Sequence, residues 1–143
     1  MRKPLININN NMENKLLTTI EFEPRKADVI IGEDELTISD INFSYHHDQD
    51  CCENVYADFS VVKYYKKQIE DMGEINKIEI KSVEDCGFII FIYKAQIYDE
   101  QREGILINCY NSQNGYYSSD LQLVIKYNGK EERMDLEKHD NIC

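Results

Sequence analysis

The chain has 143 residues, with 16 lysines and arginines against 27 aspartates and glutamates, which gives a formal net charge of −11 at neutral pH. The length suits one domain with a real core, and a hydrophobic content of 42% with two prolines excludes disorder throughout. The charge argues against general binding to nucleic acid or anionic membranes, because both need positive charge. No apolar run approaches the roughly 20 residues that cross a bilayer.

The two ends of the chain carry little apolar pattern, so we predict a tail over residues 1–15, a single domain over 16–138 and a second tail over 139–143. Met12 is a second candidate for the natural start. The N-terminus lacks the apolar stretch of a secretory signal. Five cysteines, an odd number with one vicinal pair, do not resemble a secreted disulfide framework. We therefore expect a soluble protein in reducing cytoplasm, with Cys86 and Cys109 as small core residues.

The first predicted elements are extended. Apolar residues over 17–22 predict a strand that Pro24 ends. Over 36–45 two sets of alternating apolar residues are offset by one residue at Ser39-Asp40. Such an offset predicts a β-bulge or a bend at that point. A short extended segment is expected at 54–59.

One helix is predicted, from Val61 to Met72. Ser60 is expected to cap its N-terminus and Gly73 to end it. Its lysines come early and its acids late, which opposes the helix macrodipole, so docking must stabilise it. Its apolar residues recur at spacings of three and four, as on one helix face. These residues are Val61, Val62, Tyr65, Ile69 and Met72.

The rest of the chain has a β pattern, in which apolar segments alternate with short polar turns. Asn128-Gly129 between two such segments is a strong signal for a type I′ hairpin. We therefore predict an α+β fold, mainly an antiparallel β-sheet meander with one packed α-helix. The predicted strands cover 75–81, 87–98, 104–110, 116–127 and 133–137.

Residues 45–58 hold the densest cluster of reactive side chains. His47, Cys51 and Cys52 have imidazole and thiol groups at a spacing that would suit zinc. However, the sequence has no second C-x₂-C or H-x₃-H half-site. A reactive thiol needs electropositive surroundings, whereas carboxylates flank these cysteines. We therefore favour a structural loop with no metal and no cofactor, and keep the three residues as weak zinc candidates.

The segment 111–120 is rich in hydroxyl and amide side chains. Tyr116 and Tyr117 alternate where a strand is predicted to start, so one is expected in the core and one outside. Together with Ser118 and with Gln49 of the cysteine loop, they are candidates to line a small-ligand pocket. Turn chemistry accounts for the segment equally well, and the sequence has no glycine-rich phosphate loop.

Charge is distributed unevenly. From Glu33 to Asp58 the sequence has eight carboxylates and no lysine or arginine. Such a run is either a solvated face or a surface offered to a basic partner, for example a nucleic-acid channel where carboxylates imitate phosphates. The candidate partner-binding residues are Glu33, Asp34, Glu35, Asp40, Asp48, Asp50, Glu53 and Asp58.

Two segments carry a family resemblance. The sequence H-D-Q-D-C-C-E-N-V-Y at 47–56 and N-G-Y-Y-S at 114–118 resemble motifs of a bacteriophage-associated family of unknown function. The similarity covers roughly residues 36–127. The chain departs from the family where an acidic pair usually follows, because it has Ala57-Asp58, and where it carries the lysine-rich helix. The resemblance supplies no catalytic residues and implies a phage or mobile-element setting, with action against a host system.

Three functions remain open. The first is a non-enzymatic accessory protein that binds and inhibits a host protein through its acidic surface in the bacterial cytoplasm. The host protein would have a basic surface, as a nucleic-acid-guided defence nuclease does, and the chain would then be anti-CRISPR-like. The second is a module that binds or sequesters a small ligand such as a nucleotide signal. The third is a zinc-dependent or thiol enzyme. We favour the first; the sequence leaves the oligomeric state open.

Overall fold

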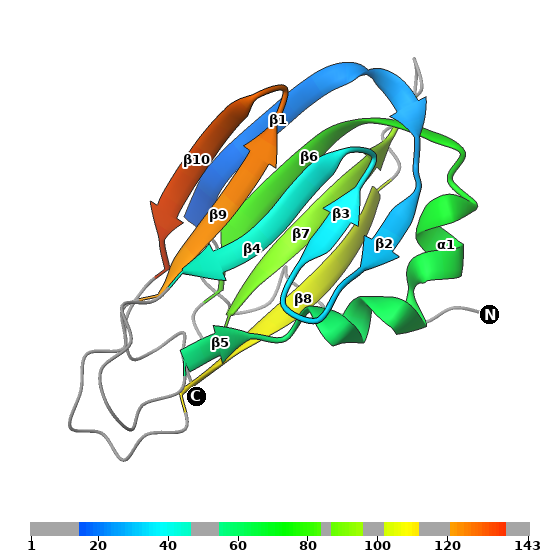
Figure 1. Cartoon of the computed structure of the whole chain (residues 1–143). Helices are drawn as coiled ribbons and strands as arrows, with labels where there is room; N and C mark the ends of the chain where they lie inside the picture. Colours follow the sequence, from blue (N-terminus) through cyan, green and yellow to red (C-terminus); the bar gives the residue numbers. More distant parts are fainter. Residues whose placement is uncertain (1–14, 47–54, 84–86, 96–101, 112–120, 137–143) are drawn as a thin grey trace.

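The computed structural model describes residues 15–46, 55–83, 87–95, 102–111 and 121–136. These residues form a mainly antiparallel β fold with two five-stranded sheets and two short helices (Figure 1). The strands are β1 (Lys15–Lys26), β2 (Val29–Ile31), β3 (Leu36–Ile38), β4 (Ile41–His46), β5 (Val55–Ala57), β6 (Glu74–Ser82), β7 (Gly87–Lys94), β8 (Arg102–Asn111), β9 (Gln122–Tyr127) and β10 (Lys130–Asp135). The helices are the 3₁₀ helix η1 (Phe59–Tyr64) and the α-helix α1 (Lys66–Glu70).

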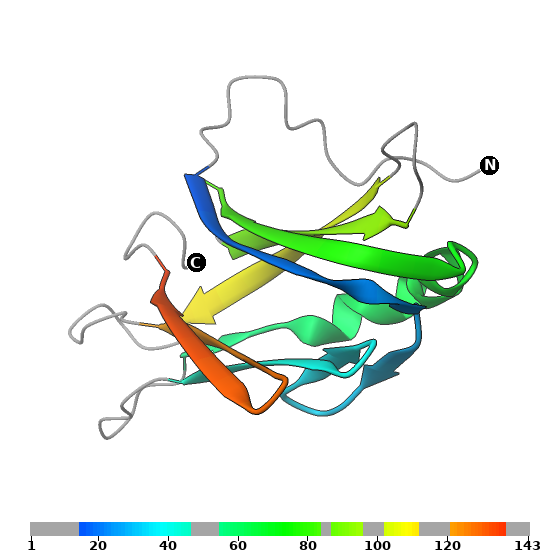
Figure 2. The ribbon, with the colours of Figure 1, turned by 90° about the horizontal axis from the view of Figure 1, so that it is seen from above.

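The two sheets lie face to face, with η1 and α1 at one side (Figure 2). The first sheet has the strand order β1-β6-β7-β8-β5 and the second β10-β9-β4-β3-β2. The prediction of a mainly antiparallel β fold is confirmed, but a single meander is wrong. The runs β6-β7-β8, β2-β3-β4 and β9-β10 follow chain order as neighbours, whereas β9 pairs with β4, β5 with β8 and β1 with β6.

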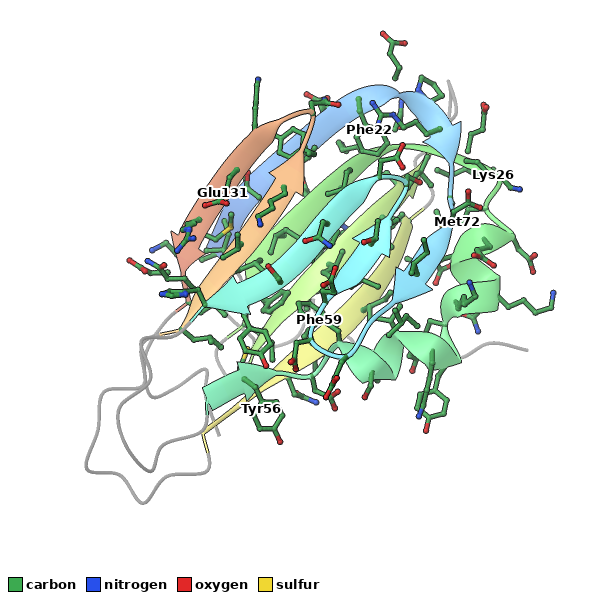
Figure 3. The ribbon with its side chains drawn as sticks, viewed as in Figure 1. Phe22, Lys26, Tyr56, Phe59, Met72 and Glu131 are labelled. Atoms are coloured by element: carbon green, nitrogen blue, oxygen red, sulfur yellow. The ribbon has the colours of Figure 1, made fainter. Side chains whose placement is uncertain are left out.

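A shared core fills the space between the sheets. Phe43 of β4, Phe88 of β7 and Ile125 of β9 are fully buried in one cluster. Burying one such side chain contributes about 1.5–3 kcal/mol. Phe59 of η1 lies in the same cluster (Figure 3), with its ring centre 6.4 Å from that of Phe88. Cys109 belongs to this core as well, which confirms the prediction for this residue.

β7 is buried on both of its faces. One set of alternate residues faces the core, and the other set forms a second cluster on the outer face of the first sheet. Cationic side chains lie over this outer cluster. The Lys77 ammonium is 4.1 Å from the ring centre of Tyr93, and the Arg102 guanidinium is 4.4 Å from that of Phe91. The nearly continuous apolar run of β7 is thus that of a central strand covered on both faces. The buried residues of the outer cluster are Val83, Ile89, Phe91 and Tyr93.

The edges of the two sheets approach each other at β1 and β10 (Figure 1). The Thr18 hydroxyl on β1 donates a hydrogen bond to Glu132 Oε1 on β10 at 3.0 Å. The other oxygen of Glu132 accepts from the Tyr127 hydroxyl at 3.3 Å. A side chain, rather than a strand ladder, therefore joins the sheets on this side.

The predicted helix is divided into two short ones. η1 and α1 meet at Tyr65, whose φ of −119° and ψ of 1° depart from helical values. Asp58, not Ser60, caps η1, because its carboxylate accepts the Ser60 N–H at 3.0 Å. Gly73 follows α1 with a φ of 85°. The predicted apolar face is confirmed, since its members are buried in the core or packed against it: Val61, Val62, Tyr65, Ile69 and Met72.

Pro24 does not end the first strand, contrary to the prediction. β1 continues to Lys26, with an irregular register between Glu21 and Arg25. β1 is an edge strand of the first sheet. A proline, which has no N–H, is tolerated at an edge or a bulge because it need not donate to a ladder there.

The offset at Ser39-Asp40 is a hairpin turn between β3 and β4, rather than a bulge within one strand. Ile38 pairs with Ile41, and the two turn residues have φ of 49° and 72°. Two positive φ values are the mark of a type I′ hairpin. The predicted type I′ turn at Asn128-Gly129 is confirmed, with φ of 50° and 73° between β9 and β10.

Candidate partner-binding site

Most of the predicted site residues lie outside the described part of the chain. The predicted zinc loop and ligand pocket therefore stay predictions. Among the residues that the structure describes, no group of three or more His, Cys, Asp and Glu side chains is placed to hold a metal ion. The predicted site residues outside the described ranges are His47, Asp48, Gln49, Asp50, Cys51, Cys52, Glu53, Tyr116, Tyr117 and Ser118, and Cys86, a predicted core residue, lies outside them as well.

Glu33, Asp34 and Glu35 occupy the turn between β2 and β3, where all three are exposed. We name these three residues the acidic turn. Two of its carboxylates are held in place by β4. The Tyr45 hydroxyl donates to Asp34 Oδ1 at 3.0 Å, and Asn42 Nδ2 donates to Glu35 Oε1 at 2.8 Å. The acidic turn thus presents three neighbouring negative charges in a partly fixed arrangement.

Tyr45 ties the acidic turn to the core. Its ring centre lies 6.4 Å from that of Phe59, which is buried between the sheets. Burial, and after it the hydrogen bond to Asp34, raises the pKa of Tyr45 to about 12. The Tyr45 hydroxyl therefore stays protonated at physiological pH and remains a hydrogen-bond donor to the acidic turn.

Asp40 and Asp58 lie apart from the acidic turn. Asp40 is in the β3–β4 turn, at the opposite end of β3 (Figure 1), and its carboxylate lies 3.9 Å from the Arg25 guanidinium. Asp58 caps η1 and also accepts the Ser60 hydroxyl at 2.5 Å. Of the described members of the predicted acidic surface, only the three in the acidic turn lie together.

Two strongly exposed apolar side chains lie on elements next to the acidic turn. Three large apolar side chains of the described residues are strongly exposed, namely Leu16 at 53%, Ile30 at 65% and Tyr64 at 70%. Ile30 lies on β2, which runs directly into the acidic turn. Tyr64 ends η1, and η1 contacts β2. Leu16 lies on β1, in the other sheet.

The sequence-based prediction of the site missed Ile30 and Tyr64, although the pattern holds a signal for each. On a strand alternate residues face opposite sides. Val29 is buried in the core and Ile31 packs against it, so Ile30 faces outward. Tyr64 is absent from the predicted apolar helix face, which leaves it toward solvent. In both cases the signal is a large apolar residue at a position that does not belong to the buried face of its strand or helix.

Among the hollows on the described surface, one along α1 and one beside the β9–β10 turn are each lined by charges of both signs. The volume of the first is about 260 Å³ and that of the second is about 480 Å³. In the second hollow, the hydrogen bond from Arg133 Nε at 2.8 Å holds the pKa of Glu131 below its ordinary value. Figure 3 shows Glu131 on β10. Such mixed linings do not select for a ligand of one charge.

Comparison of the chain with family models, with curated proteins and with solved structures gives no match. No helix in the described part of the chain is long and apolar enough to cross a membrane. The candidate site is the acidic turn together with Ile30 on the strand before it and Tyr64 on η1, which contacts that strand. It rests on the geometry of this chain alone.

Proposed function

We propose that the chain is a non-enzymatic accessory protein of a phage or mobile element, which binds a basic surface of a host protein and inhibits it by covering that surface. The observation that carries the proposal is the acidic turn with two strongly exposed apolar side chains on neighbouring elements. A nucleic-acid-guided nuclease is one such host protein, because its channel must be basic to hold nucleic acid.

The two kinds of side chain would have separate roles in binding. Exposed carboxylates steer a basic partner and speed association. Large apolar and aromatic side chains supply affinity when they are buried at the centre of an interface. The hydrogen bonds to Asp34 and Glu35 also reduce the ordering that binding would otherwise require of their side chains.

The test neutralises the acidic turn without removing its hydrogen-bond acceptors. In the variant Glu33→Gln/Asp34→Asn/Glu35→Gln, amide oxygens can still accept from Tyr45 and Asn42. The partner is captured from bacterial lysate with the wild-type chain and identified by mass spectrometry, and its affinity for each variant is then measured. We expect about a tenfold loss, since exposed charges contribute roughly 0.5 kcal/mol each and about 1.4 kcal/mol is a factor of ten.

The matched control is Glu21→Gln/Glu23→Gln/Glu74→Gln. It removes three exposed carboxylates from β1 and β6, so both variants have the same net charge. The control should keep wild-type affinity. An equal loss in both variants would show that only the net charge matters, and no loss in either would rule out the acidic turn as the contact.

A further inference from the structure

The open edge of the second sheet is closed by two side chains of α1. β2 is the last strand of that sheet, so one of its sides has no strand partner. There the Val29 N–H donates to Glu70 Oε2 at 3.0 Å, and Lys66 Nζ donates to the Val29 carbonyl at 2.6 Å. The donor and the acceptor that an additional strand would use at Val29 are thus both occupied.

The two side chains are also paired with each other. Lys66 Nζ lies 2.9 Å from Glu70 Oε2, four residues along α1. Side by side they offer Val29 one acceptor and one donor, as a residue of a neighbouring antiparallel strand does. We name this pair the edge clip. Its hydrogen bonds, first from Lys66 and then from Val29, hold the pKa of Glu70 below its ordinary value.

The packing of α1 holds the edge clip against β2. Ile69, between the two clip residues, is completely buried in the core. At the same corner the Ala27 N–H donates to the Gly73 carbonyl at 2.8 Å, which ties the chain after α1 to the start of β2. Figure 3 shows Lys26 and Met72 at this corner. The helix is therefore fixed over the edge at both the clip and the corner.

β2 would be a self-complementary edge if it were uncovered. Its residues Val29, Ile30 and Ile31 are β-branched and uncharged, which is the composition of a strand prone to edge pairing. An antiparallel two-fold pairing centred on Ile30 sets Val29 opposite Ile31 of a second copy, so these residues can exchange hydrogen bonds. The two Ile30 side chains, each 65% exposed, would then cover each other.

We propose that the edge clip prevents self-association, because it occupies a strand edge that would otherwise pair with β2 of a second copy of this chain. Edge strands are open to such pairing unless a bulge, a charge or a covering segment protects them. Here the edge of β2 is protected by α1, because its Lys66–Glu70 ion pair makes the hydrogen bonds to Val29 that a neighbouring strand would make. The edge clip acts on the backbone of β2, whereas the proposed partner binding uses the exposed Ile30 side chain of the same strand.

The test compares two neighbouring ion pairs on α1. Lys66→Ala/Glu70→Ala removes the edge clip. Lys67→Ala/Asp71→Ala is the control and removes an ion pair of the same charge and spacing. Both of its side chains are exposed, and Lys67 Nζ donates to Asp71 Oδ2 at 3.1 Å. We expect the mass of the clip variant in sedimentation equilibrium to rise with concentration above that of wild type. Hydrogen exchange at the Val29 amide should also become about tenfold faster, because the amide loses the Glu70 carboxylate as its hydrogen-bond acceptor.

The control variant should match wild type in both measurements. The same mass for the clip variant as for the control, or a rise in both, would overturn the proposal. If the double variant fails to fold, the single variants Lys66→Met and Lys67→Met are compared in the same measurements. Lys66→Met frees the Val29 carbonyl and leaves Glu70 in place. Self-association of Lys66→Met alone is expected; equal mass for the two single variants would overturn the proposal.

Discussion

Glu70 shows how one side chain can join local and long-range structure. Its carboxylate accepts from Lys66, four residues before it, and from the backbone of Val29, 41 residues before it. The Lys66–Glu70 spacing is visible in the sequence, but the contact with Val29 is not, because no local pattern relates a helix to the edge of a distant strand. The sequence predicted the helix and its buried face, and could not predict what its charged face does.

Glu70 should make folding stability depend on pH in the acid range. Its pKa in the folded chain is lowered from the ordinary 4.5, chiefly by the hydrogen bond from Lys66. A carboxyl with a lowered folded pKa stabilises the fold above its unfolded pKa, and the contribution is lost as the pH falls through the folded value. The melting temperature of wild type should therefore exceed that of Glu70→Gln at pH 7, and the difference should vanish in acid. A constant difference down to pH 2 would contradict this role of Glu70.

At the scale of elements, the sequence predicts a β-bulge or a bend at Ser39-Asp40, and the structure has a hairpin turn there between β3 and β4. A turn and a bulge both displace the apolar alternation by one residue, so the pattern alone cannot separate them. Asn128-Gly129 has the residue types of a type I′ turn, and this turn was predicted correctly. Ser39-Asp40 does not have these residue types. Long-range contacts hold Ser39 instead, since its N–H donates to the Asp28 carbonyl at 3.0 Å and its hydroxyl to the Lys26 carbonyl.

Two substitutions in this turn should change stability in opposite directions. Asp40→Gly should stabilise the fold by about 0.5–1 kcal/mol, because glycine adopts a φ of 72° without strain. Ser39→Ala should destabilise it by about 1–3 kcal/mol, because it leaves the Lys26 carbonyl without this donor in a buried place. Urea unfolding of both variants provides the measurement. A change of the same sign in both would show that backbone strain and the Ser39 bond do not control this turn.

At the scale of the whole molecule, the sequence locates most strands but not the sheets that they form. Alternation shows which residues of a strand face a core, yet it does not show which strand lies beside it. The pairing of β9 with β4 was therefore not predicted, and the structure has two sheets where the sequence predicted a single meander. The same limit applies to the site, because a run of carboxylates in the sequence does not show that Asp40 and Asp58 lie apart from the acidic turn.

The second sheet and η1 together form the candidate site. The acidic turn is held from β4 through Tyr45 and Asn42, and Tyr45 rests against Phe59 of η1 between the sheets. Ile30 and Tyr64 are exposed because the strand and the helix that carry them bury their other faces. The chain thereby places charge and apolar surface at one end of the fold.

The association rate with the captured partner tests most directly whether this end recognises a basic surface. Exposed charges steer encounters over the screening length, about 8–10 Å at physiological ionic strength, so the rate constant should fall as salt is raised. Neutralising the acidic turn should lower that rate constant and flatten its dependence on salt, with little change in dissociation. Ile30→Ser and Tyr64→Ser should instead speed dissociation, while Leu16→Ser should change neither rate. Association that is independent of salt in the wild type, or equal effects from Leu16→Ser and Tyr64→Ser, would contradict recognition through this end of the fold.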